Sequence, residues 1–197
     1  MKPFSKRINL AVAVAVCLAL GQNVHAQKMT VHLDPAQTEI RWTLTDTLHT
    51  VHGTFKLKVG TMIFDSKTGM AEGELLVDAN TGESGIGQRD KAMRKTVLET
   101  ERYPMVSFHP AKVAGEPKPG NTQDMTVDGT FNIHGADHPL RVGVKVQLDG
   151  NNVTATTHFV VPYVDWGLKD PSNFVLKVGK DVSVDVVAHG TIEGMHN

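Results

Sequence analysis

Two pairs of histidines have a spacing at which imidazole rings can share a metal ion. His49 and His52 are three residues apart, His134 and His138 are four apart, and each pair adjoins a glycine. Zinc and copper both accept imidazole ligands. Neither pair lies in a helical pattern, where this spacing would bring the two rings to one face, and no cysteine supports them. The pattern favours hydrogen-bonded or surface loop histidines, with a histidine-based metal-binding stress protein as an alternative.

A glycine-rich segment, residues 82–87, surrounds Ser84 and precedes a run of helix-forming residues. No base is evident for Ser84, and the chain has no G-x-S-x-G motif. Backbone N–H groups at such a turn can receive a phosphate or carboxylate, but the Lys-Ser/Thr of a nucleotide-triphosphate loop is absent. A flexible turn is the simpler interpretation. The sequence therefore predicts no catalytic residue, no metal ligand and no cofactor, so we expect a protein that is not an enzyme.

The elements that must position these residues are strands almost throughout. Apolar and polar residues alternate with period two, which is typical of sheets with one apolar and one polar face. This pattern recurs in residues 40–45, 55–64, 75–77, 106–108, 127–133, 140–148, 153–163 and 182–186.

Turn and helix signals divide these runs. Asp149-Gly150-Asn151-Asn152 predicts a hairpin between the two longest strands, whereas residues 89–99 are rich in helix formers and end before Pro104. About eight strands in one domain predict either a two-sheet sandwich or a closed barrel. A closed barrel leaves no exposed edge, and at about eight strands its interior can hold one small ligand.

The N-terminus has the features of a secretory signal peptide. Lys2, Lys6 and Arg7 precede an apolar run over residues 8–20, and small residues follow at 24–26. The run is too short for a comfortable membrane span, which needs about 20 apolar residues. We therefore predict a cleaved signal peptide over residues 1–26, a single domain over residues 27–197, and a periplasmic location. Cys17, the only cysteine, leaves with the signal, so the exported domain has no disulfide.

Charge excludes some partners. The formal net charge of −1 for 197 residues falls to −4 when the three basic residues of the signal are removed. Because no basic surplus remains, nothing favours binding to nucleic acid or to anionic membrane surfaces. No further apolar stretch is long enough to predict stable insertion into a membrane.

The order of several short motifs resembles the YceI-like family of bacterial periplasmic proteins, which are described as polyisoprenoid-binding. The resemblance extends from about Val31 to Gly190. One departure is Trp166, where the family usually has phenylalanine. The motifs are Leu33-Asp34, Thr38-Glu39-Ile40, Leu48 to Phe55, Phe64-Asp65, Arg89-Asp90, Arg102 to Phe108, Gly129 to Gly135, His138-Pro139 and Asp165-Trp166-Gly167-Leu168.

This resemblance implies an all-β fold: an eight-stranded antiparallel lipocalin-like barrel with one short helix and an apolar tunnel. It also implies an isoprenoid ligand, of the polyprenyl or quinone type, or a related long-chain lipid, and a homodimer. The apolar strand faces and the lack of predicted catalytic residues agree with this implication, because an aliphatic tunnel binds a long apolar chain without any reactive group. A hydrolase or isomerase acting on a lipid inside the barrel is the alternative from a different class.

The predicted ligand contacts combine strand residues on the apolar face with polar residues at an opening. Trp166 is expected either to cap the barrel mouth or to pack beneath a loop. The residues expected to line the interior are Trp42, Phe55, Leu57, Phe64, Val77, Phe108, Phe131, Val144 and Phe159, and the polar contacts are His49, Arg89 and His134.

Overall fold

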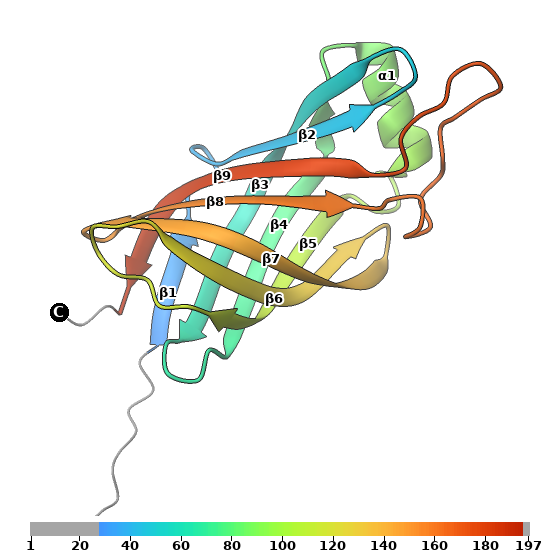
Figure 1. Cartoon of the computed structure of the whole chain (residues 1–197). Coiled ribbons are helices and arrows are strands. Elements are labelled where there is room, and N and C mark those ends of the chain that lie inside the picture. Colours follow the sequence, from blue (N-terminus) through green and yellow to red (C-terminus); the bar gives the residue numbers. More distant parts are fainter. Residues whose placement is uncertain (1–27, 195–197) are drawn as a thin grey trace, which may run out of the picture.

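A computed structural model describes residues 28–194, in which one antiparallel sheet coils into a barrel (Figure 1). The predicted signal peptide lies outside the described residues. The strands are β1 (Lys28–Leu33), β2 (Glu39–Thr45), β3 (Thr50–Asp65), β4 (Ala71–Glu83), β5 (Met105–Ala114), β6 (Gln123–Ile133), β7 (Ala136–Asp149), β8 (Asn152–Val161) and β9 (Val182–Glu193).

The nine strands form an eight-stranded barrel because β1 and β2 share one position. β1 pairs with the last residues of both β3 and β9, as in Met29 with Phe64. β2 pairs with the first residues of the same two strands, so that Trp42 lies opposite Gly53. The remaining strands follow in order from β9 to β4, and β4 closes the ring on β3. The predicted barrel is confirmed, and the sandwich alternative is wrong.

Period-two alternation sets the two faces of the wall. In β7, Val142 and Leu148 are buried on the inner face, while Arg141 and Lys145 are exposed on the outer face. The outer residues pair across strands, for example Lys145 with Asp124 at 2.8 Å. Exposed pairs of this kind contribute little to stability, so burial of the inner face is the main stabilising factor.

The predicted helix is confirmed, with a shift of two residues. α1 (Gly87–Ala92) continues into a π-helical turn, η1 (Met93–Val97). The wider turn is visible in the hydrogen bond from Leu98 N–H to Met93 O, at 2.9 Å. The helix ends where Glu99 adopts a positive φ of 47°. No helix of residues 28–194 is long and apolar enough to cross a membrane.

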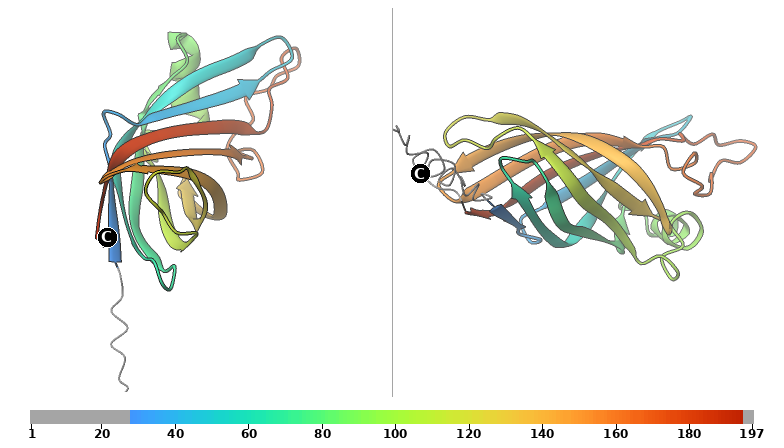
Figure 2. Two further views of the ribbon diagram at one scale, coloured as in Figure 1. Left: turned by 60° about the vertical axis from the view of Figure 1, so that its left-hand side comes forward. Right: turned by 90° about the horizontal axis from the view of Figure 1, so that it is seen from below.

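The two ends of the barrel differ in their connections (Figure 2). We call one the helix end: it carries the β2–β3 loop (46–49), the helical segment between β4 and β5, the β6–β7 turn (134–135) and the β8–β9 loop (162–181). We call the other the packed end: it carries the β3–β4 turn (66–70), the β5–β6 loop (115–122) and the predicted β7–β8 hairpin turn (150–151), which is confirmed.

Candidate ligand-binding cavity

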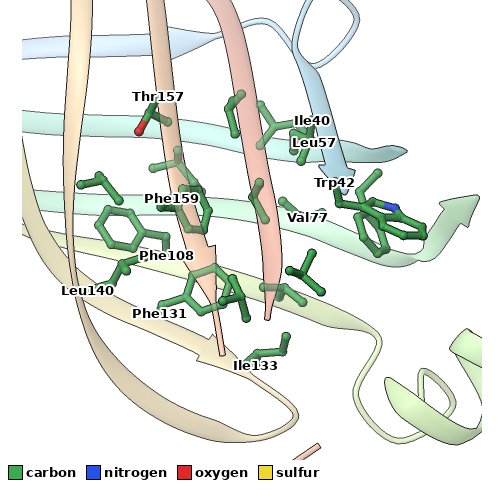
Figure 3. A pocket seen from close by; sticks show the side chains of 18 of the residues that line it. Ile40, Trp42, Leu57, Val77, Phe108, Phe131, Ile133, Leu140, Thr157 and Phe159 are labelled. Atoms are coloured by element: carbon green, nitrogen blue, oxygen red, sulfur yellow. The ribbon is translucent and has the colours of Figure 1, made fainter. Parts of the chain in front are cut away.

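A cavity of about 500 Å³ occupies the inside of the barrel. Its size lies within the usual range for small-molecule sites, about 300–1,000 Å³. Inward-facing side chains from all nine strands form its wall. Figure 3 shows several of them pointing toward one space, among them Ile40, Leu57, Val77, Phe108 and Phe159.

Small side chains two residues inward from the buried Leu148–Val153 pair of the packed end border this space. Val146, Ala155 and Ala188 lie side by side across β7, β8 and β9 and all line the cavity. Val146 and Ala155 face inward yet are only half-buried, as inner residues are when they border a hollow rather than a packed core. Their short side chains do not reach across the barrel, so a cavity remains where a larger set would give a solid core.

The packed end is filled by contrast. Phe64 is 3% exposed and Ile192 is 2% exposed, and both belong to one cluster of buried apolar residues with Val113. Buried Pro117 of the β5–β6 loop also lines the cavity, and the same loop bridges to Leu148 through Pro119. The loop therefore covers this end of the cavity.

Aromatic rings form two contact groups along the wall. Phe131 and Phe159 meet edge to face, with centroids 6.1 Å apart. Trp42 and Phe55 meet with ring centroids 6.5 Å apart. Trp42 lies against Gly53, where an added Cβ would stand 2.3 Å from the indole ring. Its buried Nε1 has no acceptor among the described residues, so this wall offers an indole donor with no partner.

The described part of the chain contributes two charged side chains to the cavity wall, Asp46 and Arg89, both at the helix end. The Asp46 carboxylate accepts hydrogen bonds from the backbone N–H groups of Leu48 and His49, each at 2.7 Å. These bonds, with the nearby charges of His49 and Arg89, lower the pKa of Asp46. The carboxylate therefore stays ionised at neutral pH and holds the β2–β3 loop in place.

Arg89 is held by the segment that precedes the helix. Its Nε donates to Ser84 Oγ at 2.7 Å and its Nη2 donates to Ser84 O at 2.9 Å. The Ser84 hydroxyl in turn donates to the carboxylate of Asp90, which is buried. The glycine-rich segment of the sequence thus fixes an arginine at the cavity wall, and Ser84 is engaged in positioning it.

Nine of the residues expected inside and one expected polar contact line the cavity. That they contact a ligand stays a prediction. They are Trp42, Phe55, Leu57, Phe64, Val77, Phe108, Phe131, Val144, Phe159 and Arg89.

The other three predicted residues do not line the cavity: His49, His134 and Trp166. The His49 side chain is exposed beside Asp46, at 3.8 Å. His134 pairs with Glu99 at 3.0 Å and lies 4.4 Å from the Tyr103 ring. His49 lies on the β2–β3 loop and His134 in the β6–β7 turn, outside the strands that build the wall.

Trp166 stacks on His138, with ring centroids 4.1 Å apart and planes 6° from parallel. It also lies 5.7 Å from the Phe131 ring and does not line the cavity. Trp166 belongs to the β8–β9 loop, and its partners His138 and Phe131 lie opposite each other on β7 and β6. Its expected role at the barrel mouth stays a prediction. The indole covers an imidazole whose buried Nε2 has no partner in the described residues.

The sequence patterns missed the part of the wall that comes from the helix end. Met93 and Val97 of η1 line the cavity, as do Leu176 and Val178 of the β8–β9 loop. Helical and loop segments lack the period-two signal that marked the strand residues. The spacing of Met93 and Val97, four apart in a helical segment, was the available signal for an inward helix face.

The histidine pairs do not assemble. His52 contacts Thr43 Oγ1 at 3.0 Å, while His138 stacks on Trp166. Between residues 28 and 194, no group of three or more His, Cys, Asp or Glu side chains is placed to hold a metal ion.

Solved structures share this architecture. A polyisoprenoid-binding domain from Saccharophagus degradans, implicated in plant cell wall breakdown, has a TM-score of 0.63 and 18% identity, covering 83% of this chain and 98% of that one. Burkholderia cenocepacia BcnA has a TM-score of 0.65 and 19% identity, with coverage of 81% and 99%. A YceI protein of Campylobacter jejuni has a TM-score of 0.51 and 12% identity, covering 71% and 80%. At these identities the likeness concerns the fold.

The sequence comparison is more specific. No curated protein has a sequence significantly similar to this chain. The model of the YceI-like domain, however, matches residues 32–189, from the last two residues of β1 into β9, which ends at Glu193. The match includes β2 to β8 in full, most of β9 and the helical segment that adjoins the cavity. The chain belongs to the YceI-like family.

Proposed function

We propose that this protein binds a long-chain lipid of the isoprenoid class, polyprenyl or quinone-type, in its internal cavity and carries or sequesters it in the periplasm. The observation that supports this most is an apolar cavity of about 500 Å³ inside a closed wall. Burying a methylene contributes about 0.8 kcal/mol, so an aliphatic chain in such a space binds without any reactive group. The similar domain from Saccharophagus degradans is described as polyisoprenoid-binding.

The ligand lies with its polar group at the helix end and its chain toward the packed end. The charged residues of the wall, Asp46 and Arg89, stand at the helix end, and the packed end is lined by apolar groups such as Phe64. The aromatic contacts Trp42, Phe131 and Phe159 flank the chain between them. Arg89 is the polar contact in this arrangement.

Binding without catalysis is the form of the proposal that these contacts favour. A lipid hydrolase or isomerase needs a base free to reach the ligand. Asp46 is engaged by two backbone N–H groups, and Tyr163, which also lines the cavity, donates its hydroxyl to Gly179 O at 2.8 Å. Both groups serve the loops of the helix end. The periplasmic location rests on residues 1–26, and the homodimer implied by family resemblance stays a prediction.

The test is native mass spectrometry with lipid extraction on protein purified from its own periplasm, followed by titration with a polyprenol or a quinone. We expect a co-purified isoprenoid and saturable binding. Ala155→Trp places a large ring inside the cavity and should weaken binding at least ~10-fold, because the inserted ring occupies the space of the chain. Thr156→Trp places the same ring one residue away on the outer face and should bind as the unmodified protein does.

Two results would overturn the proposal. One is protein that is consistently free of lipid and binds neither polyprenol nor quinone. The other is equal binding by the Ala155→Trp and Thr156→Trp variants, since a ligand unaffected by a filled cavity does not sit in it.

A further inference from the structure

The helix end of the barrel exposes large apolar side chains on three separate segments. Phe174 and Val175 of the β8–β9 loop are 98% and 83% exposed, Leu48 of the β2–β3 loop is 71% exposed, and Ile86, which precedes α1, is 54% exposed. Soluble proteins rarely gather such residues at one end unless that end contacts an apolar partner. Figures 1 and 2 show these three segments together at the end of the barrel that carries the helix, with the β8–β9 loop reaching furthest outward.

The most exposed residues are held outward by an ordered turn. Asn173 N–H donates to Leu176 O at 2.9 Å, and the Asn173 Oδ1 accepts from the N–H groups of Val175 and Leu176 at 2.9 and 2.8 Å. Phe174 and Val175 are thus the two corner residues of a closed turn. The loop is tied to the β2–β3 loop by Thr47, whose N–H donates to Lys177 O at 2.9 Å. Two of the three exposed segments therefore form one hydrogen-bonded unit.

Each exposed segment also supplies a wall residue of the cavity. Leu176 is the residue after Val175, Asp46 is two before Leu48, and Arg89 is three after Ile86, and all three line the cavity. We call Phe174, Val175, Leu48 and Ile86 the rim. These residues therefore surround the end of the cavity that the helix and loops complete. A surface that contacts this rim also lies next to the bound molecule.

The helical segment beside the rim, residues 87–97, carries a net positive charge although the chain as a whole does not. Residues 87–97 carry Arg89, Lys91, Arg94 and Lys95, against a single acidic residue, Asp90, which is buried. The β8–β9 loop is balanced in charge, and the full chain has a net charge of −1. Exposed apolar side chains next to a cluster of basic ones are the combination that binds an anionic lipid surface.

From this geometry we infer that the helix end is a membrane-docking surface: Phe174, Val175, Leu48 and Ile86 enter the interface of an anionic bilayer while the exposed Lys91 and Lys95 contact its headgroups. The whole-chain charge gave no reason to expect this, because a net charge of −1 conceals the local excess of basic residues in the helical segment. The inference extends the proposed function, since a docked rim lets a lipid pass between bilayer and cavity without crossing water. The docking itself is measured independently of any cargo.

The test is flotation of the exported protein with vesicles of phosphatidylethanolamine and phosphatidylglycerol, and with vesicles of phosphatidylcholine alone. Mass spectrometry must first verify the N-terminus, because the apolar residues 8–20 would bind vesicles by themselves. We expect binding to the anionic vesicles that weakens with added salt. The double variant Phe174→Ser/Val175→Ser should bind roughly tenfold more weakly, because it removes the apolar anchors. Its matched control is Met70→Ser, an exposed apolar residue at the packed end, which should bind normally.

A second pair of variants tests the charge. Lys91→Glu/Lys95→Glu reverses exposed charges beside the rim and should abolish the preference for anionic vesicles. Lys56→Glu/Lys58→Glu reverses two exposed charges on the side wall of β3 and should leave the preference intact. Equal behaviour of the two charge variants, or of the serine variants and Met70→Ser, would overturn the inference.

Other outcomes separate this inference from the proposed function. If the rim is instead an interface between two copies, the protein alone sediments as a dimer and does not bind vesicles. The double variant Phe174→Ser/Val175→Ser then dissociates this dimer, and the docking inference is wrong. If the protein binds vesicles but no polyprenol or quinone, docking stands and the proposed cargo fails. If the serine variant loses vesicle binding but keeps its bound lipid, both proposals are supported.

Discussion

The two ends of this barrel share the same alternating strand pattern, but side chains fill the interior at one end and border a hollow at the other. At the packed end, β1 lies across the ends of β3 and β9, and side chains such as Phe64 and Ile192 fill the interior. At the helix end, loops and a short helix complete the wall, and apolar groups face both a hollow and the solvent. The difference indicates that the packed end contributes most of the stability of the domain, which leaves the other end open for the binding that we propose.

The largest expected effect is on the packed end. Phe64→Ala removes a fully buried ring from its cluster and should lower the free energy of unfolding by about 3–5 kcal/mol. Phe55→Ala removes a half-buried ring that borders the cavity, and should cost less than about 2 kcal/mol because less packing is lost. Chemical denaturation of both variants measures the contrast. Equal losses would show that the two ends contribute alike to stability.

A backbone contact gives a sharper comparison. An added Cβ at Gly190 would lie 2.0 Å from His32 O, where β1 crosses β9, so Gly190→Ala must displace a strand. We expect a loss of about 1–3 kcal/mol. Gly143→Ala in β7 meets nothing within 4 Å and should be neutral or stabilise by up to about 1 kcal/mol. Thermal unfolding of the two variants should therefore give opposite shifts, and a Gly190→Ala variant as stable as Gly143→Ala would show that β1 is loosely attached.

The smallest effect concerns the helix end at alkaline pH. Burial, with the charges of Asp170 and Asp181, raises the pKa of Tyr163 to about 12. The folded protein therefore holds this proton more strongly than the unfolded chain, in which the pKa is about 10. The contribution is complete below pH about 10 and is lost as pH rises through about 12.

Unfolding measured against pH in the unmodified protein and in Tyr163→Phe should reveal that loss in the first protein only. Hydrogen exchange should locate it in the β8–β9 loop, because the Tyr163 hydroxyl donates to Gly179 O. Parallel pH profiles for the two proteins would show that Tyr163 ionises without affecting the helix end.

Local patterns accounted for much of the wall. Period-two alternation identified β7 and β8 and the faces that Val144 and Phe159 occupy, because a strand turns successive side chains to opposite sides regardless of its neighbours. The same reasoning found the helical segment through its composition. It did not find Leu176 or Val178, since a loop that folds back over a barrel has no repeating pattern to read.

The sequence by itself determined every strand except β1, together with the inner faces of those strands, the hairpin at Gly150 and the short helix, because each depends on residues close together in the chain. Only the tertiary structure decided that β1 and β2 share one position in the ring, that small residues such as Ala155 and Ala188 leave a cavity, and that Arg89 reaches its wall. These features depend on the distance across a closed barrel. That distance is set by all the strands together, and no local stretch of sequence contains it.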